Sequence, residues 1–398
     1  MKHPSPPLKI VPVNNQERLD QVCAQCRRDG QFAFDTEFVM EDRFEPEVCL
    51  IQIAVGDTSY IIDPFLELEI ACVWELVCDA EVETVVHAGQ EDLAFCMQHL
   101  GRTPRRICDV QIAAGFVGYD YPLSLQKLVR QCVGARLHKS KTLTDWRRRP
   151  LTEAQIQYGA EDVCYLLAVW RQVQERLKRS KRLEWVREEF AKFEDANLYE
   201  RPEEEKLARL KGAGGLKGQA LAVVRSLLSW RQELAERRNR PARVALKDHL
   251  LVEIARHGLS TFEEARDLRG LNLADRDIHD LCRVVREALD SPKEKWPVPR
   301  RQDTETPHES VLIALSTAVV RAYCLEEDIA YGLAASKKSI MEMVRYCVNG
   351  SSTRENVELL RGWRRQTVGA ILEGVLRGQR VIQVDGKSGH NLISTPSA

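Results

Sequence analysis

The stretch Phe32-Ala-Phe-Asp-Thr-Glu-Phe38 sets two acids inside a run of aromatic and apolar residues. It follows the turn signal Asp29-Gly30 and predicts a buried strand. The two-residue period of a strand puts Asp35 and Glu37 on one face. Neighbouring buried carboxylates repel each other and are costly to desolvate, and a cation between them relieves both costs. For so short a pattern taken alone, a strand end where both acids reach water is the commoner explanation.

A third acid follows the next strand signal. Thr84-Val-Val-His87 predicts a short strand, Ala88-Gly89 a turn, and the chain from Gln90 onward has a helical period. Asp92 therefore lies in the first turn of a helix that follows a strand. An acid at this place also favours the helix N-terminus without any further role. We expect His87, at the strand end, to bond to the backbone rather than to a metal.

A third segment carries a tyrosine and an acid one helical turn apart. Pro150 ends the preceding stretch, and Thr152 is a good N-cap for the helix that follows. Tyr158 and Asp162 are four positions apart, so they lie on one face of that helix. Taken alone, this spacing also fits an ordinary surface pair. Together the four acids offer only oxygen ligands, which suit magnesium or manganese rather than zinc.

The order and spacing of these segments resemble the DEDD superfamily of 3′-to-5′ exonucleases, in the subgroup with a tyrosine in the third motif. The resemblance covers about residues 30–170 and extends to the ribonuclease D family. Two departures are Gly159, where the family more often has alanine, and Met40, where relatives often carry a basic residue. The resemblance is carried by Phe34-Asp-Thr-Glu-Phe38, Cys49-Leu-Ile-Gln-Ile53, Ile62-Asp-Pro64, His87-Ala-Gly-Gln-Glu-Asp92, Asp145-Trp146, Arg149-Pro-Leu151 and Tyr158-x-x-x-Asp-Val163.

The resemblance implies a 3′-to-5′ exoribonuclease that hydrolyses RNA with two Mg²⁺ (or Mn²⁺) ions and releases nucleoside 5′-monophosphates. By analogy, Asp35, Glu37 and Asp162 hold one metal. Asp35 bridges to the second metal, with Asp92 in its shell. Tyr158 orients the attacking water. The implied substrate is RNA with a free 3′ end, tRNA precursors above all, and protein partners stay unknown.

A local basic cluster precedes the third motif. The formal net charge of the whole chain is only −1, from 58 basic and 59 acidic residues, so a nucleic-acid surface has to be local. We expect nucleic-acid contacts from Lys139, Lys141, Arg147 and Arg149. Trp146 is a candidate for stacking on a base, although capping the core is the commoner role. A solvated loop that tolerates charge is the alternative. The full cluster is Arg136, His138, Lys139, Lys141, Arg147, Arg148 and Arg149.

The first 200 residues are expected to form an α/β exonuclease domain with a ribonuclease-H-like mixed sheet. Helices should cover both faces of this sheet, and the acids should gather at one edge of it. Expected strands lie near 32–38, 48–55, 58–63 and 84–87, the first three as a meander. Expected helices lie near 90–100, 109–117, 123–133 and 152–178.

Two helical domains are expected after the exonuclease domain. Residues 201–215 and 292–308 have linker composition, and 386–398 that of a disordered tail. Residues 309–385 are expected to be a divergent second copy of the domain at 216–291, on length, helical period and position. A generic helical bundle for protein contacts is the alternative. The domain at 216–291 resembles the helicase-and-RNase-D C-terminal (HRDC) module through Trp230-Arg231, Ala235, Asn239-x-Pro241 and Asp248-x-x-Leu251.

The composition and motifs of the chain also predict its cell compartment and argue against some kinds of chemistry. The twelve cysteines are scattered, many in apolar runs, as in a cytoplasmic protein with reduced thiols. Cys23-x-x-Cys26 has no second pair or nearby histidines, so we expect no zinc site there. We recognise no signal peptide and no apolar run of membrane-spanning length, and we expect no membrane contact. The phosphate-binding Gly-x-x-x-x-Gly-Lys-Ser/Thr motif is missing, so we expect no ATP hydrolysis.

Three other functions fit part of the sequence. The first is a related exonuclease that acts on DNA ends, because no residue is seen to recognise a 2′-hydroxyl. The second is a catalytically inactive RNA-binding scaffold, against which the presence of all five motif residues argues. The third is a helicase accessory module, which the helical domains alone suggest.

Overall fold

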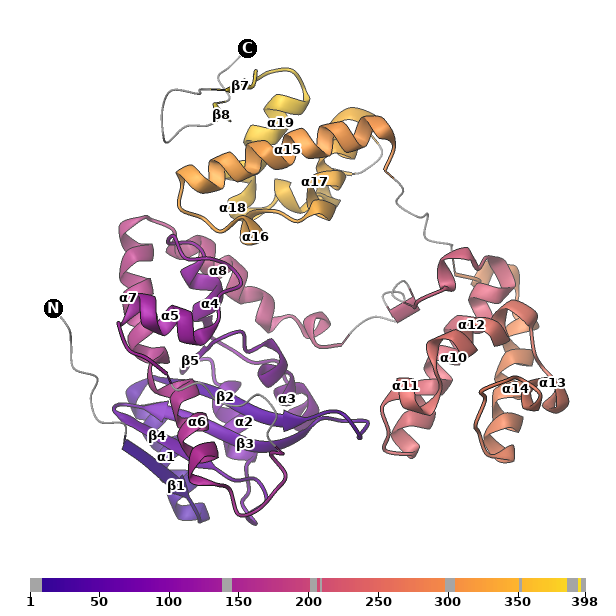
Figure 1. The fold of residues 1–398 in the computed structure, drawn as a ribbon, viewed down its shortest axis with the longest axis horizontal. Coiled ribbons are helices and arrows are strands. Elements are labelled where there is room, and N and C mark those ends of the chain that lie inside the picture. Colours follow the sequence, from indigo (N-terminus) through magenta and orange to yellow (C-terminus); the bar gives the residue numbers. More distant parts are fainter. Residues whose placement is uncertain are drawn as a thin grey trace. The chain divides into compact units, whose positions relative to one another are not determined.

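A mixed sheet forms the centre of the N-terminal region in this computed structural model (Figure 1). Its six strands are β1 (Lys9–Val13), β2 (Gln31–Val39), β3 (Glu47–Val55), β4 (Thr58–Ile62), β5 (Glu83–Val86) and β6 (Ile107–Asp109). They lie in the order β1-β4-β3-β2-β5-β6. β1 is parallel to β4, β3 is antiparallel to β4, and β5 is parallel to both β2 and β6. The structure describes residues 9–137, 145–200, 206–207, 210–297, 305–350, 353–384 and 393–394.

The four predicted strands are all present. They correspond to β2, β3, β4 and β5, and the first three are neighbours in the sheet, as the predicted meander requires. β1 and β6, at the two edges, were not predicted. β1 contains Pro12, which lacks an N–H group and is tolerated mainly at a sheet edge. The three residues of β6 are too few to show a period.

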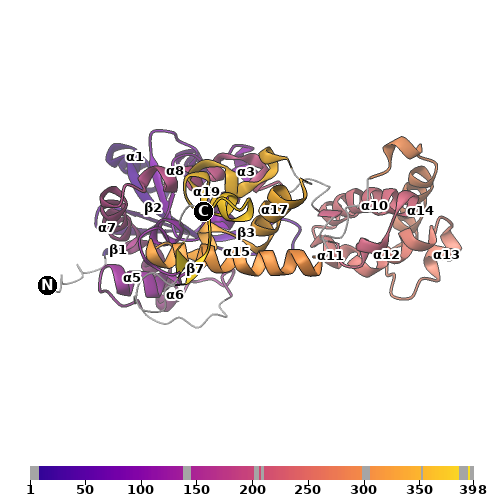
Figure 2. The ribbon, with the colours of Figure 1, turned by 90° about the horizontal axis from the view of Figure 1, so that it is seen from above.

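Helices pack on both faces of the sheet, as expected. Phe34 and Asp35 are adjacent in β2 and therefore point to opposite faces. Phe34 packs edge-on against Trp74, with ring centroids 6.0 Å apart. On the other face, Gly159 lies against the side chains of Leu50 and Gln52. Figure 2 shows helices on both sides of the sheet. The α-helices are α1 (Gln16–Asp29), α2 (Ala71–Val77), α3 (Gln90–Leu100), α4 (Val110–Ala114), α5 (Leu125–Cys132), α6 (Glu153–Cys164), α7 (Leu166–Arg179) and α8 (Leu183–Phe190).

The helices predicted in the N-terminal region are present at the expected positions, but some differ from the prediction in length. α3 matches its predicted range, and α4 and α5 are shorter than predicted. The prediction of one continuous helix over 152–178 is wrong in one respect. The chain turns at Tyr165, so two helices, α6 and α7, occupy this range. Helices α1 and α2 were not predicted. Two 3₁₀ helices, Ala191–Glu194 and Ala196–Leu198, follow α8.

A second group of helices follows residue 210. α10 packs against both α12 and α14, and their apolar side chains form a buried core. Within this core, Arg231 donates to Asp248 at 2.6 Å and to the Leu246 carbonyl at 3.1 Å. The residues that carried the HRDC resemblance therefore hold this group of helices together. Its elements are α10 (Gly218–Arg237), α11 (Ala242–Ala245), α12 (Asp248–His257), α13 (Phe262–Arg266), α14 (Asp275–Leu289) and the 3₁₀ helices Ala213–Gly215 and Lys293–Lys295.

The C-terminal region is also helical. It contains α15 (Pro307–Glu326), α16 (Tyr331–Ala334), α17 (Lys337–Val344), α18 (Gly362–Arg364) and α19 (Ala370–Leu376). Between them lie the π-helical turns Arg345–Asn349 and Arg365–Gly369 and the 3₁₀ turns Arg354–Asn356 and Glu358–Leu360. β7 (Gln383–Val384) pairs with β8 (Ile393–Ser394). Most of the tail predicted at 386–398 lies outside the described residues.

Helix α15 differs from the expectation that no apolar run reaches membrane-spanning length. By length and composition alone it is long and apolar enough to cross a membrane. Its buried side chains, among them Ile313, Val319 and Val320, lie in the interior of the helical region, and α15 packs against α17. Glu309 in its first turn is paired with Arg345 at 2.8 Å. Core helices pass the same test, so one such helix is weak evidence of a membrane span.

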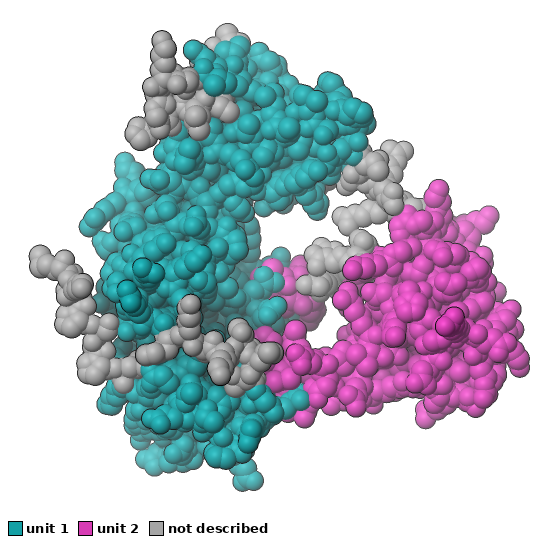
Figure 3. Space-filling view, in the orientation of Figure 1, with its two compact units in different colours: residues 1–37, 49–196, 305–398 teal, residues 38–48, 197–304 magenta. Residues whose placement is uncertain are grey.

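The chain divides into two compact units (Figure 3). One unit contains residues 1–37, 49–196 and 305–398, and the other contains 38–48 and 197–304. The C-terminal helices therefore belong to the same compact unit as the sheet. The second unit also includes the segment between β2 and β3, where the Phe44 N–H group donates to Asn239 at 3.3 Å.

Candidate active site

Strand register places the first two acids at the end of the sheet. β2 pairs with β5 only from Gln31 to Ala33, where Ala33 lies opposite Val85. Asp35 and Glu37 therefore extend beyond the last residue of β2 that pairs with β5. Both side chains are half-buried, while Phe34 and Thr36, on the other face, are buried. This confirms the alternation predicted for the strand.

The third acid is fixed to the same strand from the opposite face. α3 begins directly after the turn that ends β5, and Asp92 lies in its first turn. The buried Asp92 carboxylate accepts hydrogen bonds from both the backbone N–H (3.1 Å) and the hydroxyl of Thr36. Gly89 permits the tight turn, because a Cβ there would lie 2.7 Å from Val86 Cβ. Asp92 is thus held beside the strand that carries Asp35 and Glu37.

Helix α6 supplies the tyrosine and the fourth acid. Thr152 caps it, and Thr152 and Gln155 form a reciprocal capping box, which confirms the predicted N-cap. Tyr158 and Asp162 lie on one face of the helix, and the Tyr158 hydroxyl hydrogen-bonds to Asp162. Between them, Gly159 lets the helix approach β3 closely, since a Cβ there would lie 3.0 Å from both Gln52 Nε2 and Leu50 Cδ2.

The pKa shifts show that the four acids share one electrostatic environment. Burial and the charges of Asp92, Asp162 and Glu37 raise the pKa of Asp35 well above its ordinary value. Burial, together with the charges of Asp162 and Asp92, raises the pKa of Glu37 to about 8. Burial also raises the pKa of Asp162 to about 7, although the bond from Tyr158 opposes this shift. Acids that raise one another's pKa in this way form a site for a cation.

The donor chemistry fits a hydrated hard cation. Within the described ranges, no three His, Cys, Asp or Glu side chains converge closely enough to form a metal cage by themselves. Mg²⁺ seldom needs such a cage, because it usually binds through one or two carboxylates and takes its other ligands from water and substrate phosphates. The four carboxylates thus fit magnesium in a site that a phosphate completes.

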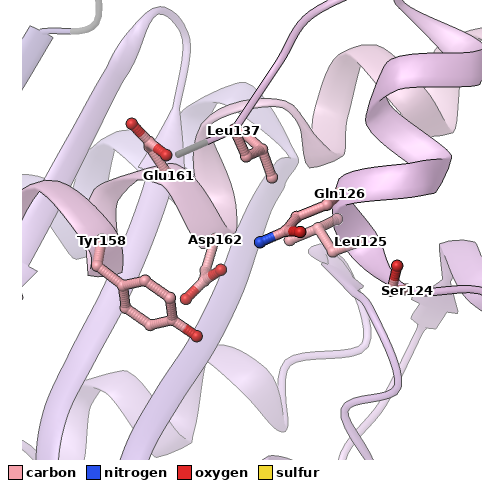
Figure 4. Close-up of a pocket in the computed structure, with 7 residues that line it drawn as sticks. All are labelled: Ser124, Leu125, Gln126, Leu137, Tyr158, Glu161 and Asp162. Carbon is pink, nitrogen blue, oxygen red and sulfur yellow. The ribbon is translucent and has the colours of Figure 1, made fainter. Parts of the chain in front are cut away.

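A pocket of about 250 Å³ opens next to these groups (Figure 4). Tyr158 and Asp162 form one side of it, and the Gln126 amide on the opposite side points toward Asp162. Leu125 and Leu137 add an apolar part. The pocket combines apolar side chains for a base or sugar with polar groups near the acids. It is lined by Ser124, Leu125, Gln126, Leu137, Tyr158, Glu161 and Asp162.

The residues predicted to contact nucleic acid differ in their exposure and surroundings. Lys139 and Lys141 lie outside the described residues. Trp146 is only 9% exposed, and its ring packs against Tyr158 with centroids 5.9 Å apart, so it offers little surface for base stacking. The Arg147 side chain is half-buried.

Arg149 is used inside the protein. Its guanidinium donates to Asp63 through Nε and Nη2, at 2.5 and 2.6 Å. It also donates to the carbonyls of Cys49 (2.8 Å), Trp146 (2.7 Å) and Arg148 (3.1 Å). All five N–H groups of the guanidinium thus have partners. These bonds hold the loop that carries Trp146, and the expected contact of Arg149 with RNA stays a prediction.

Several residues that support the site were not predicted. Thr36 holds Asp92, and the buried Asp109 caps α4 while accepting from the backbone N–H of Ala88 at 3.2 Å. The pocket wall formed by Ser124 and Gln126 was also missed. Asp109 follows a strand too short to recognise, and the pocket wall depends on how loops meet in space. His87 behaves as expected, because its Nε2 bonds to the Leu123 carbonyl at 2.9 Å.

Comparison with known proteins identifies the family. Residues 10–178 match the family model of a 3′-5′ exonuclease, and residues 220–285 match that of the HRDC domain. The chain is 30% identical over 391 residues to ribonuclease D of Granulibacter bethesdensis, covering 97% of this chain and 96% of the relative. It is 31% identical over 382 residues to ribonuclease D of Gluconacetobacter diazotrophicus, covering 94% and 95%. The chain belongs to the ribonuclease D family.

The fold agrees with that of a solved ribonuclease D. The crystal structure of Escherichia coli RNase D, described as an exoribonuclease involved in structured RNA processing, superposes with a TM-score of 0.80. It covers 93% of this chain and 99% of that one, at 25% identity. The predicted fold class, a mixed-sheet exonuclease domain followed by a helical HRDC region, is confirmed. This ribonuclease D family member is a 3′-5′ exoribonuclease, and its family implies a divalent metal cofactor. The second HRDC-like copy at 309–385 stays a prediction.

Proposed function

We propose that this protein trims the 3′ ends of structured RNA, tRNA precursors in particular, by two-metal hydrolysis that releases nucleoside 5′-monophosphates. The observation that supports this most is a set of four carboxylates beside a pocket of about 250 Å³, whose pKa values are raised by burial and, for Asp35, Glu37 and Asp162, also by neighbouring acids. Such a set favours a doubly charged cation, and a bound cation would in turn attract a phosphate group.

The residues divide into metal-holding and positioning groups. Asp35, Glu37 and Asp162 would hold one Mg²⁺ or Mn²⁺ ion, and Asp35 with Asp92 a second. Such ions stabilise the charge on the attacking and leaving oxygens of an in-line displacement. Thr36 fixes one oxygen of Asp92, so the other oxygen is oriented away from the strand. The Tyr158 hydroxyl, which bonds Asp162, would orient the attacking water.

Around this centre we propose that Lys139, Lys141 and Arg147 contact phosphates of the RNA, as their charge suits. We assign Trp146 and Arg149 to supporting Tyr158. We propose the division into an exonuclease domain at 1–200 and helical domains at 216–291 and 309–385, with linkers between. We further propose that the protein acts in the cytoplasm, because all twelve cysteines are free thiols, and that it uses neither ATP nor a membrane.

Digestion of a 3′-extended tRNA in magnesium tests the proposed function. Products should shorten one nucleotide at a time from the 3′ end, appear as 5′-monophosphates, and disappear when a chelator is present. Sizing the products from both ends separates trimming from internal cleavage, and internal cuts contradict the exonuclease assignment. DNA of the same sequence, digested in parallel, measures the preference for RNA.

Removing one carboxylate tests the assigned site. We expect Asp35→Asn and Asp162→Asn each to lower kcat by at least about 10³-fold, because each removes charge that holds a metal at the transition state. Glu161→Gln is the matched control, since Glu161 lines the pocket but bonds to Gln157 at 2.7 Å. Near-normal rates in purified, folded Asp35→Asn protein would remove the basis of the assignment.

A further inference from the structure

The loop at residues 115–124, between α4 and α5, is in contact with the C-terminal helices. The Ala330 N–H group donates to the Gly115 carbonyl at 2.7 Å. The buried Leu333 side chain lies directly over Gly115, where a Cβ would be 2.5 Å from Leu333 Cδ1. Tyr121 lies against Gly332, with a ring carbon 3.3 Å from where a Cβ would be. We call residues 327–334 the interdomain segment.

The interdomain segment is itself fixed to the exonuclease domain by buried charged groups. Arg182 is 9% exposed and donates to the Phe116 carbonyl at 3.0 Å and to Glu327 at 2.6 Å. Arg364 donates to the Leu333 carbonyl at 2.7 Å and to Glu189 of α8 at 2.6 Å. Arg182, Arg364 and Glu189 are charged, buried and hydrogen-bonded, which makes the contact geometrically specific.

The same loop leads directly into the active-site pocket. The Leu123 carbonyl accepts from His87 Nε2 at 2.9 Å and from Gln111 Nε2 at 3.1 Å. The next residues, Ser124 to Gln126, line the pocket opposite Tyr158 and Asp162. His87 precedes the helix that carries Asp92. The loop therefore joins the interdomain segment at one end to the pocket wall at the other.

We propose that the interdomain segment positions the pocket wall, so that the C-terminal helices are part of the catalytic unit and not only an RNA-binding attachment. Leu333 and Gly115 act as positioning residues, because neither reaches the reacting atoms. Their contact sets the path of loop 115–124 and hence the place of Gln126 relative to Asp162. The inference rests on the proposed function, since it concerns the pocket that would receive the 3′-terminal nucleotide.

The test compares two leucine truncations in the full-length protein. Leu333→Ala removes the contact with Gly115, and Leu372→Ala removes an equally buried leucine from α19, which packs within the C-terminal helices. Each is measured on a 3′-extended tRNA and on a four-nucleotide RNA that is too short to span a second binding surface. We expect Leu333→Ala to lower kcat on the short RNA by about 10-fold, because misplaced groups lose catalytic alignment. We expect Leu372→Ala to stay within about twofold of wild type.

A second measurement tests the position of the loop without depending on nuclease activity. Amide hydrogen exchange over residues 122–132 should be faster in Leu333→Ala than in wild type and unchanged in Leu372→Ala. Gly115→Ala, which forces Leu333 aside, should reproduce both effects if Leu333→Ala proves poorly folded.

The outcomes separate the two proposals. A wild-type protein that digests neither RNA overturns the proposed function, while the exchange measurement still tests the positioning of the loop. If Leu333→Ala slows only the tRNA reaction, or if exchange over 122–132 is unchanged, the positioning role is overturned and the C-terminal helices act through RNA binding alone.

Discussion

At the scale of single residues, the candidate site is a set of acids whose charged forms are disfavoured by burial and by neighbouring acids. Glu37 and Asp162 have pKa values raised to about 8 and about 7, with burial as the main cause. Each charge that is useful for binding metal is therefore unfavourable to the metal-free fold. Function and stability oppose each other at these positions, as is common in active sites.

This opposition predicts how the metal-free protein responds to pH. Aspartate and glutamate in an unfolded chain ionise near pH 4 (about 3.9 and 4.3). Between there and about pH 8 the folded state binds more protons than the unfolded state, because its acids keep their protons longer. The free energy of unfolding should therefore fall as pH rises through this window. Urea unfolding in chelator at several pH values measures the slope.

Two additions check that the slope comes from the site. Magnesium should flatten it, because the ion compensates the charges as they form. Asp35→Asn should also reduce it and should stabilise the metal-free protein at pH 8. A profile in chelator that is level from about pH 5 to about pH 8 contradicts this account.

Arg149 gives a second prediction at this scale. Arg149→Lys keeps the charge but replaces a planar group with five donors by an ammonium that cannot reproduce their geometry. We expect the free energy of unfolding to fall by about 2 kcal/mol. We also expect kcat to fall, because Trp146 and its contact with Tyr158 lose their support. The exposed neighbour Arg148 supplies the control, and Arg148→Lys should change neither quantity.

At the scale of elements, the close approach of α6 to β3 determines where Tyr158 and Asp162 lie. Gly159 faces Leu50 and Gln52, which are fully buried and have little room to move. The Gln52 amide also has no hydrogen-bond partner in the structure. A Cβ at position 159 therefore requires either these two side chains or helix α6, with Tyr158 and Asp162, to shift.

Gly159→Ala tests this contact because two effects oppose each other. Alanine favours a helix over glycine by about 1 kcal/mol, whereas added volume in a packed core costs about 1–3 kcal/mol. We expect a net loss of about 1 kcal/mol in the free energy of unfolding, with lower kcat. Ala154→Gly, at an exposed position of the same helix, calibrates the propensity effect. If Gly159→Ala stabilises the protein, the gain in helix propensity outweighs the cost of the added volume. The contact between α6 and β3 is then loosely packed.

Helices and strands whose hydrophobic pattern repeats over many residues could be predicted from the sequence. Short elements, and positions that depend on contacts with distant segments, could not. β2 and β3 have nine residues each with buried apolar side chains, and both were predicted. The edge strands β1 and β6 lacked such a signal, for one contains Pro12 and the other has three residues. The four acids and Tyr158 could be proposed because they lie on regular elements and because their order and spacing resemble those of a known family. Ser124 and Gln126 could not, since their place depends on contacts with distant segments.

At the scale of the whole molecule, buried pairs join the C-terminal helices to the exonuclease domain. Glu189 accepts from Arg364 and from the indole of Trp363, at 2.6 and 2.8 Å. Burial acts to raise the pKa of Glu189, but Arg364 and Lys192 outweigh it and hold the pKa below its ordinary value. Trp185 stacks on Trp363, with ring centroids 5.5 Å apart. The two parts should therefore unfold together.

Glu189→Ala should destabilise the protein strongly, by about 3–5 kcal/mol, because it leaves the Arg364 charge buried without its partner. Urea unfolding followed by tryptophan fluorescence measures this loss, since Trp185 and Trp363 lie at the contact. Glu184→Ala removes an exposed ion pair with Arg187 and should change stability by no more than about 1 kcal/mol. Equal effects of the two substitutions would show that the Glu189–Arg364 pair does not join the two parts.

The distance along the chain between these partners has a consequence for synthesis. Glu189 and Arg364 are 175 positions apart, and translation proceeds at roughly 5–20 residues per second, so the second partner follows the first by roughly 9–35 seconds. For most of that interval the nascent exonuclease domain already has its carboxylates but lacks residues 327–334, which contact loop 115–124. A nuclease made beside the ribosome's own RNA would thus reach full activity only when nearly all of its chain has been translated.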